Sequence, residues 1–297
     1  MKIAYIFQIY KDFEYHAKVF RMLKEPWCDI YVHIDKKSKI DLKKYIKEYN
    51  LEDIHFLKDR ISVYWAGFTQ IQATLKLFKE VQKSGQKYDR IIFMTDNEFP
   101  CWSNQKIYEF FEQNKGKEFM KVANPKDFDG RFEYSISRMN TYTFFDCPLF
   151  KNMPRIKLIN MMVRWQRFQR EVLSISRKLL PFHYYRGNAK FYITQEFMDY
   201  VLDYVKHNPK DLNTFKHTAG GDEVFFTTLL MNSRFKENRV DKLFRYHKWL
   251  KNAPTVKVLT IEDLPNIEKV DPFVCAKIVP ETSAELIEYL MKKRQAV

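Results

Sequence analysis

The sequence predicts an α/β fold in which helices cover a mostly parallel central sheet, formed as a single domain. Short apolar segments suited to buried strands alternate with longer segments whose apolar residues recur at helical spacing. Repeated strand–helix units of this kind build parallel sheets with helices on their faces. The 297 residues contain no internal repeat and no linker rich in glycine, serine or proline, so we expect one domain.

The first third of the chain carries the clearest alternation of strands and helices. Strands are expected at Lys2–Ile9, Asp29–Ile34, His55–Leu57, Ile61–Trp65 and Arg90–Thr95. Helices are expected at Phe13–Leu23, Ile40–Tyr49, Phe68–Val81 and Asn104–Phe111. Such sheets bind their ligands at the carboxyl ends of the strands. Asp35 and the segment Asp96–Glu98 directly follow strands, so we expect both at the binding edge of the sheet.

A basic stretch and further mixed structure follow in the rest of the chain. Between residues 151 and 180, basic and apolar residues alternate, and Glu171 is the lone acid. This pattern fits a helix that lies on an anionic membrane, and it also fits a surface helix whose apolar side packs on the protein. Later elements are expected at Lys190–Thr194 as a strand, and at Glu196–Val205, Asp222–Met231 and Ser283–Lys293 as helices.

The net charge of +14 favours polyanionic partners, namely nucleic acid, an anionic membrane face or a diphosphate substrate. Only 7 glycines occur, and no glycine-rich phosphate loop is present, so phosphates would be held by basic side chains or by a metal. A nucleic-acid-binding protein is the main alternative, because the aromatic content of 16 % would suit base stacking. The absence of RNP1, zinc-finger and helix-turn-helix signals speaks against that alternative.

The cysteines and the apolar segments predict a cytoplasmic setting. None of the 4 cysteines forms a CxxC pair, and in a chain of this length we expect reduced thiols. The residues after Met1 resemble a strand more than a signal peptide. No run reaches the ~18 apolar residues of a membrane span.

A glycine turn at Gly220–Gly221 opens a predicted helix that starts with two acids, Asp222 and Glu223. We expect Asp222 to cap the first backbone amides. Glu223 lies in the first turn, where the helix dipole favours an ionised carboxylate, and such a group on a rigid element can act as a general base. The alternative is that both acids only cap the helix.

Two further patterns are candidates for diphosphate binding. The triplet Asp96–Glu98 follows an apolar strand and offers oxygen ligands that suit Mg²⁺ or Mn²⁺, although it also fits an ordinary polar strand end. A second acidic triplet at Asp127–Asp129 is a weaker candidate for the same role. Lys277 lies among apolar residues, and therefore needs either an anionic partner such as a phosphate or a route to water.

Seven short strings, taken in chain order, resemble glycosyltransferase family 14, which contains the core-2 and I-branching β-1,6-N-acetylglucosaminyltransferases and the peptide O-xylosyltransferases. The strings are Tyr31–Ser38, Val63–Phe68, Tyr88-Asp89 with Met94–Pro100, Gly187–Phe191, Asp222–Phe226, Arg245 with Trp249, and Phe273–Ile278. Each string alone is a weak signal. Together they keep the family's order over residues 31–278, and this order makes the resemblance specific.

The resemblance implies a GT-A-like single domain over residues 1–297, with a nucleotide-binding part at about 1–125 and an acceptor and catalytic part at about 126–297. It implies inversion at the anomeric carbon, with Glu223 as the base and with basic side chains in place of a metal at the leaving diphosphate. The implied donor-binding residues are Asp35, Trp65, Glu98, Arg245 and Lys277. The acceptor residues, assigned from chain order alone, are Arg131, Glu133 and Arg138.

The chain departs from the family pattern near the proposed diphosphate site. A Ser-Gly-x-Asp segment of the family reads Thr95–Glu98 here, which restores a triplet able to bind a metal through Asp96 and Glu98. Ala276 stands where an arginine is frequent, and Gln8 stands where a histidine is common. We expect no cofactor, with Mn²⁺ or Mg²⁺ as the alternative.

The function implied is transfer of a sugar from a UDP-sugar to a saccharide hydroxyl in surface-polysaccharide synthesis. N-acetylglucosamine is the first expectation for the sugar, and xylose is the second. A lipid-linked saccharide acceptor would bring residues 151–180 to the inner face of a membrane as a peripheral contact. The eukaryotic members carry a membrane anchor and many cysteines, and neither feature is evident in this sequence. We therefore expect a bacterial, cytoplasmic version without a nucleic-acid partner. An inactive sugar-binding relative is the alternative within the family.

Overall fold

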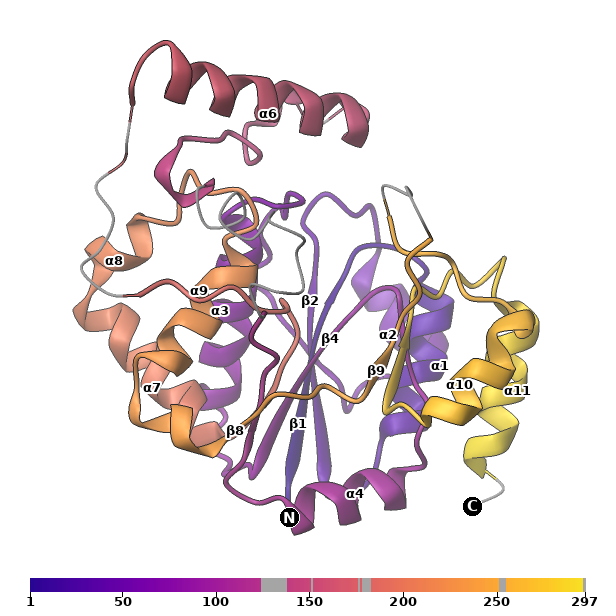
Figure 1. The fold of residues 1–297 in the computed structure, drawn as a ribbon. Coiled ribbons are helices and arrows are strands. Elements are labelled where there is room, and N and C mark those ends of the chain that lie inside the picture. Colours follow the sequence, from indigo (N-terminus) through magenta and orange to yellow (C-terminus); the bar gives the residue numbers. More distant parts are fainter. Residues whose placement is uncertain (124–137, 151, 176, 178–182, 251–254, 296–297) are drawn as a thin grey trace.

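Seven strands form the central sheet of the computed structural model, in the order β3-β2-β1-β4-β7-β6-β8 (Figure 1). The structure describes residues 1–123, 138–150, 152–175, 177, 183–250 and 255–295. The strands are β1 (Ile3–Ile9), β2 (Cys28–Ile34), β3 (His55–Phe56), β4 (Arg90–Thr95), β6 (Glu118–Phe119), β7 (Tyr192–Ile193) and β8 (Arg239–Val240). Neighbouring strands are parallel except at β7, which is antiparallel to β4 and β6. The predicted mostly parallel sheet is confirmed, and strands from both halves of the chain share it.

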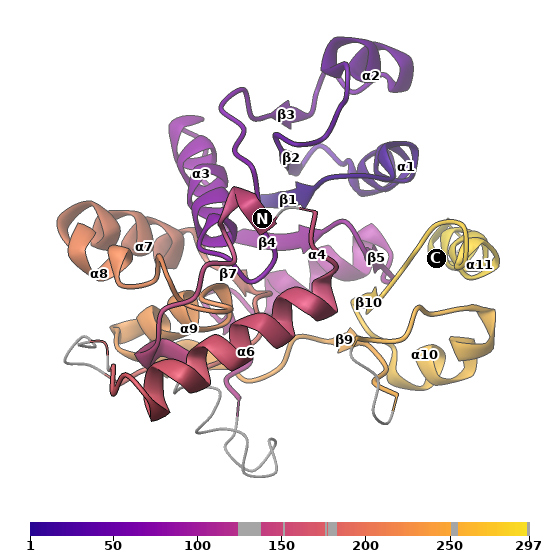
Figure 2. The same cartoon turned by 90° about the horizontal axis from the view of Figure 1, so that it is seen from above.

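Helices cover both faces of this sheet, as the sequence predicts (Figures 1 and 2). One face carries α1 (Phe13–Leu23), α2 (Leu42–Tyr49), α4 (Asn104–Gln113), α10 (Leu264–Val270) and α11 (Ala284–Gln295). The other face carries α3 (Thr69–Lys83), α7 (Gln195–His207), α8 (Pro209–Asn213) and α9 (Asp222–Met231). Successive residues of β1 join opposite clusters, with Tyr5 in one and Ile6 in the other, which is why this strand is apolar except at Gln8.

A smaller sheet stands beside the carboxyl end of β4. It consists of β5 (Glu98–Pro100), β10 (Val274–Ala276) and β9 (Arg245–Tyr246). The middle strand, β10, is antiparallel to β5 and parallel to β9. Because β5 follows β4 closely, this sheet carries residues from near the end of the chain to the segment Asp96–Glu98. The sequence analysis did not predict these three short strands.

Helix α6 (Arg155–Glu171) lies beyond the carboxyl end of the central sheet, on the side of β4 and α9 (Figures 1 and 2). Met162 of this helix is buried in a small apolar cluster with Ala66, Phe145 and Ala219. Packing on the protein therefore accounts for one side of the basic stretch. In the part of the chain that the structure describes, no helix is both long and apolar enough to cross a membrane. Short 3-10 helices complete the fold at η2 (Arg138–Asn140), η3 (Pro148–Phe150), η4 (Arg234–Asn238) and η5 (Ile261–Asp263).

The predicted strand at Ile61–Trp65 is wrong, because this segment forms a loop. The backbone N–H of Ile61 donates to His33 Nε2 at 3.1 Å. The backbone N–H of Val63 donates to Asp35 Oδ2 at 3.4 Å. Side chains at the end of β2 thus take the backbone donors that pairing with another strand would use.

The start of α9 also differs from the prediction. Gly221, which has no side chain, occupies the N-cap position predicted for Asp222, and Asp222 is the first residue of the helix. Glu223 does lie in the first turn, as predicted. The four cysteines are free thiols, which agrees with the expected reduced state.

Candidate active site

Three of the predicted site residues, Asp35, Glu98 and Glu223, lie at one edge of the central sheet, where β2 and β4 end and α9 begins. Asp35 directly follows β2 and is 7 % exposed. Its carboxylate accepts a hydrogen bond from the backbone N–H of Lys37 at 2.8 Å and forms an ion pair with the ammonium of Lys37 at 2.9 Å. Asp35 therefore shapes the loop after β2, at the edge where sheets of this type bind ligands.

Trp65 lies in the loop that Asp35 holds, and it is 43 % exposed. The carbonyl of the next residue, Ala66, accepts a backbone hydrogen bond from Gly220 at 2.8 Å. Gly220 precedes the first turn of α9, so this bond ties the Trp65 loop to the helix start that carries Glu223. The residues expected at the nucleotide and the residue expected to act as the base are therefore held on adjoining segments.

Glu223 projects from the first turn of α9 with its side chain 35 % exposed. Arg186 donates from Nε and Nη2 to Glu223 Oε2, at 3.0 and 2.7 Å. The backbone N–H of Gly187 donates to the Glu223 carbonyl at 2.7 Å. A Cβ at Gly187 would lie 2.4 Å from the carbonyl oxygen of Lys121, so this close approach needs glycine. The segment 186–187 thus fixes the position of the candidate base.

Lys190 places a second cation near the start of α9. Its ammonium lies 4.5 Å from the centroid of the Phe93 ring, at the end of β4. Burial lowers the pKa of Lys190 to about 8, and the charges of Asp96 and Asp222 oppose this effect. Burial raises the pKa of Asp96, with Lys190 as the foremost opposing charge. Lys190 therefore acts as an internal cation between the acid that follows β4 and the acid that begins α9.

Glu98 and Arg245 form an ion pair between β5 and β9, with Glu98 only 2 % exposed. The second carboxylate oxygen of Glu98 accepts a hydrogen bond from the backbone N–H of Thr95 at 2.5 Å. Burial lowers the pKa of Arg245 to about 10. The structure thus brings these two predicted donor-binding residues together, but their charges are paired with each other.

Lys277 follows β10 and is half-buried. The next residue, Ile278, donates its backbone N–H to the carbonyl of Asn97 at 2.9 Å, which places Lys277 beside the segment Asp96–Glu98. Within the described residues, the ammonium of Lys277 forms no hydrogen bond or ion pair. Lys277 is therefore a cation that remains available to an anionic ligand at this edge.

The acids expected to hold a metal, if one is used, face cations of the chain. Glu98 is paired with Arg245, and the charge of Asp96 is opposed by Lys190. Among the described residues, no group of three or more His, Cys, Asp or Glu side chains is placed to hold a metal ion. As arranged, Asp96 and Glu98 do not fit a divalent metal unless these cations move. The second triplet, Asp127–Asp129, lies outside the described residues.

The predicted acceptor residues are the least described part of the site. Arg131 and Glu133 lie outside the described residues, and Arg138 is the first residue of η2. The sequence analysis assigned no role to Arg186 or Lys190, although Lys190 belongs to a quoted string and Arg186 precedes it. Their position beside that string was the only available signal.

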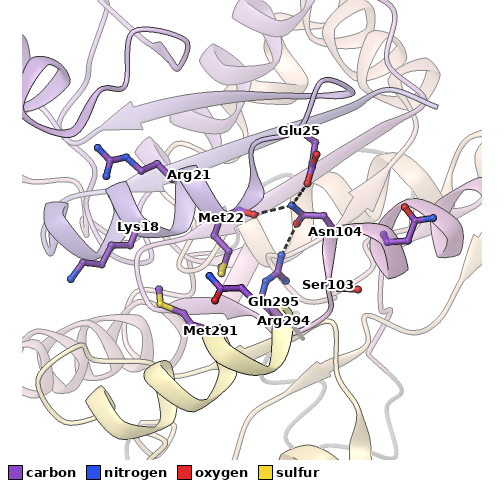
Figure 3. Close-up of a pocket in the computed structure, with 10 residues that line it drawn as sticks. Lys18, Arg21, Met22, Glu25, Ser103, Asn104, Met291, Arg294 and Gln295 are labelled. Carbon is purple, nitrogen blue, oxygen red and sulfur yellow. Dashed lines mark hydrogen bonds between the residues drawn. The ribbon is translucent and has the colours of Figure 1, made fainter. Parts of the chain in front are cut away.

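A pocket of about 560 Å³ lies away from this site, between α1, α4 and α11 (Figure 3). Several of its polar side chains bond to one another or to the backbone. Asn104 donates to the Met22 carbonyl at 2.9 Å and to Glu25 at 2.7 Å, and Arg294 donates to Asn104 at 2.6 Å. Figure 3 shows these side chains directed toward one another, which indicates a contact that joins three helices.

Comparison with known proteins identifies the family. The model of the Core-2/I-Branching enzyme family matches residues 3–268. A xylosyltransferase of Ciona intestinalis is 24 % identical over 226 residues, which cover 74 % of this chain and 23 % of that protein. A human N-acetyllactosaminide beta-1,6-N-acetylglucosaminyl-transferase is 24 % identical over 235 residues, which cover 76 % of this chain and 52 % of that protein.

The xylosyltransferase oxt of Drosophila pseudoobscura pseudoobscura is similar to the same extent, with 23 % identity over 244 residues that cover 78 % of this chain and 24 % of that protein. The chain thus spans between 23 % and 52 % of the length of these three relatives. Because the family model covers most of the sequence and the fold agrees with the expected architecture, the protein belongs to the Core-2/I-branching enzyme family.

Proposed function

We propose that this protein is an inverting glycosyltransferase that transfers a sugar from a UDP-sugar to a hydroxyl of a saccharide acceptor. The observation that carries the proposal is the placement of Glu223. Its carboxylate is partly exposed at the carboxyl edge of the sheet and held by Arg186. The bond between Ala66 and Gly220 keeps it next to the Trp65 loop. A base and a nucleotide site must adjoin in this way for the two substrates to react.

In the proposed reaction, the acceptor hydroxyl oxygen attacks the anomeric carbon from the face opposite the diphosphate. Glu223 takes the hydroxyl proton, and the bond between the anomeric carbon and the diphosphate breaks with its electron pair on the leaving oxygen. Lys277 is available to stabilise the charge that develops on the diphosphate. Arg245 stays in the proposal as a residue that shapes this site through Glu98, with which it is paired.

The identity of the sugar is a finer part of the proposal. The relatives named above are a xylosyltransferase and an N-acetylglucosaminyl-transferase, and their printed names support the same two sugars that the sequence suggests. We propose UDP-N-acetylglucosamine first and UDP-xylose second. The surface-polysaccharide role and the cytoplasmic location stay predictions from the sequence.

The test of the base is Glu223→Gln, which keeps the size of the side chain and removes its basicity. We expect transfer to fall at least 100-fold on the scale of general-base catalysis, while UDP binding by calorimetry changes little. Glu196→Gln is the matched control, because Glu196 also lies in the first turn of a helix and is paired with an arginine, Arg234. Wild-type turnover by Glu223→Gln would remove Glu223 as the base. Donor binding without any transfer in the wild type would favour an inactive relative.

A lipid-linked saccharide is the acceptor that we propose for the outward side of α6. Arg164 is exposed there, together with Val163 and Phe168, which are 41 % and 43 % exposed. Basic and apolar side chains on one exposed surface suit anionic headgroups. Sedimentation with vesicles that contain anionic lipid should retain the wild type and retain less of Arg164→Ala. Equal recovery of both proteins in the supernatant would remove the membrane from the proposal.

A further inference from the structure

The first turn of α6 brings an arginine to the candidate active site that the sequence analysis placed only within a basic stretch. The guanidinium carbon of Arg155 lies 3.9 Å from the centroid of the Trp65 ring. Trp65 in turn packs edge-on against Phe145, with ring centroids 5.6 Å apart. The guanidinium therefore lies over an aromatic ring that belongs to the loop between β3 and α3. Stacking of this kind leaves the N–H edge of an arginine free to bind a ligand.

The packing of α6 on the protein fixes the position of Arg155 relative to the rest of the site. Met162 of α6 shares a buried apolar cluster with Ala66, the residue next to Trp65, and with Ala219, which precedes the Gly220 turn. The helix thus rests on the two loops that carry Trp65 and Glu223. Figures 1 and 2 both show α6 beyond the carboxyl end of the sheet, on the side of β4 and α9. Arg155 therefore stands at the same edge as the expected nucleotide site.

The electrostatic surroundings of Arg155 lack an acid within the described residues. Arg155 forms no hydrogen bond or ion pair with any of them, and its contact is the face of Trp65. Partial burial of the guanidinium lowers the pKa of Arg155, and Tyr10 at the end of β1 is the group that opposes this effect. Burial raises the pKa of Tyr10, and the charge of Asp96 raises it further, whereas the charge of Arg155 lowers it. Arg155 and Asp96 therefore both lie near Tyr10.

We propose that Arg155 is a donor-binding residue whose guanidinium edge binds the phosphate oxygens of a nucleoside diphosphate. A planar cation with a stacked face and a free N–H edge matches the geometry of phosphate, which it can bind through two hydrogen bonds. The inference deepens the proposed function, because it names a phosphate ligand on a different element from Lys277. It also gives the inward side of α6 a role that is separate from the outward side of the same helix.

The experiment measures binding of UDP and of uridine to the wild type, Arg155→Ala, Arg155→Lys and Arg164→Ala by calorimetry. Arg155→Ala should weaken UDP binding about tenfold or more, the effect of losing hydrogen bonds to a charged group. Uridine, which has no phosphate, should bind the wild type and Arg155→Ala equally. Arg155→Lys should be intermediate, because it keeps the charge but loses the planar edge. Arg164→Ala removes the same charge from the outward side of α6 and should bind UDP like the wild type.

Each other outcome has a definite meaning. Equal UDP affinity for Arg155→Ala and Arg164→Ala would overturn the inference, and so would an equal loss of UDP and uridine binding in Arg155→Ala. Loss of vesicle binding by Arg155→Ala with unchanged UDP affinity would also overturn it and assign Arg155 to a lipid surface. If the wild type does not bind UDP, both the proposed function and this inference are wrong. If the wild type binds UDP and Arg155→Ala binds it with the same affinity, only the role of Arg155 is wrong.

Discussion

The carboxylate of Glu98 and the guanidinium of Arg245 form an ion pair inside the small sheet, where β5 and β9 flank β10. This relationship changes the meaning of both residues. The sequence pattern presents Glu98 as a donor or metal ligand and Arg245 as a cation for the diphosphate. In the structure, each satisfies the other, and the pair joins the end of β4 to a strand from late in the chain.

Glu98→Gln should therefore act mainly on stability. The substitution leaves the guanidinium of Arg245 without its acid in a buried site, and breaking a buried pair in this way typically costs about 3–5 kcal/mol. Urea unfolding should show this loss, and Glu98→Gln/Arg245→Met should recover part of it, because the double variant leaves no unpaired charge. A Glu98→Gln protein within about 1 kcal/mol of the wild type would show that the pair is not a stabilising contact.

Removal of Lys190 should alter the response of the protein to divalent metals. The charges of Asp96 and Asp222 both act on Lys190, so Lys190→Gln removes a positive charge from the neighbourhood of two carboxylates. We expect millimolar Mn²⁺ to raise the melting temperature of Lys190→Gln, because a ligand of the folded state stabilises it by mass action. The wild type should show no such rise, and its transfer activity should survive EDTA. A wild-type enzyme that stops in EDTA and restarts with Mn²⁺ would instead move the chemistry to a metal.

Acid should destabilise the fold through two buried histidines. Burial lowers the pKa of His16 to about 3 and that of His33 to about 4, from an ordinary value of 6.5. Below pH 6.5 the unfolded chain binds protons at these histidines and the folded chain does not. Stability is therefore complete above pH 6.5 and falls as the pH drops toward 4, by about 1.4 kcal/mol per pH unit for each histidine.

The control for this pH dependence is His16→Phe, which keeps an aromatic ring in a fully apolar setting. The free energy of unfolding, measured by urea between pH 4.5 and 7, should fall less steeply with acid in this variant. Both nitrogens of His16 lack a hydrogen-bond partner among the described residues, so the ring has no polar contact to lose. Parallel curves for the variant and the wild type would show that other groups drive acid unfolding.

The elements that the sequence predicts well are those with a strong local signal. The run from Ile3 to Ile9 is apolar except at Gln8 because both faces of β1 are covered, and the helix Asp222–Met231 follows a glycine turn. By contrast, β9 spans only Arg245–Tyr246, and its strand character comes from pairing with β10 rather than from its own sequence. Residues 61–65 show the reverse case, because their β-branched residues suggest a strand but the segment forms a loop. There, His33 and Asp35 take the backbone donors.

The residues of the candidate site also differ in how much of their role a local sequence pattern indicates. Glu223 and Lys277 are singled out in the sequence mainly by the family resemblance, because an acid at a helix start is also a common cap and a lysine among apolar residues can reach water, and their roles stay predictions. The partners that set their roles lie far away along the chain. Arg186 reaches Glu223 only because the backbone at Gly187 approaches α9, and Arg155 reaches Trp65 only because α6 is seated on two other loops. No local pattern encodes these contacts.

Gly187→Ala should test whether the close approach of segment 186–187 to α9 positions the base. A Cβ at this residue would lie 2.4 Å from the Lys121 carbonyl oxygen and 2.5 Å from Thr227 Oγ1, and the first of these is a backbone atom that cannot turn away. The segment must therefore shift, which we expect to cost about 1–3 kcal/mol of stability and to move Arg186 away from Glu223. Turnover should fall more than the affinity for UDP does, because the displaced contact concerns the base and not the nucleotide.

Gly221→Ala is the matched control. It also adjoins the start of α9, but its Cβ would meet only side-chain carbons, the nearest being Ile71 Cδ1 at 3.3 Å. A Gly187→Ala enzyme with the turnover of Gly221→Ala would show that Glu223 does not depend on this approach for its position.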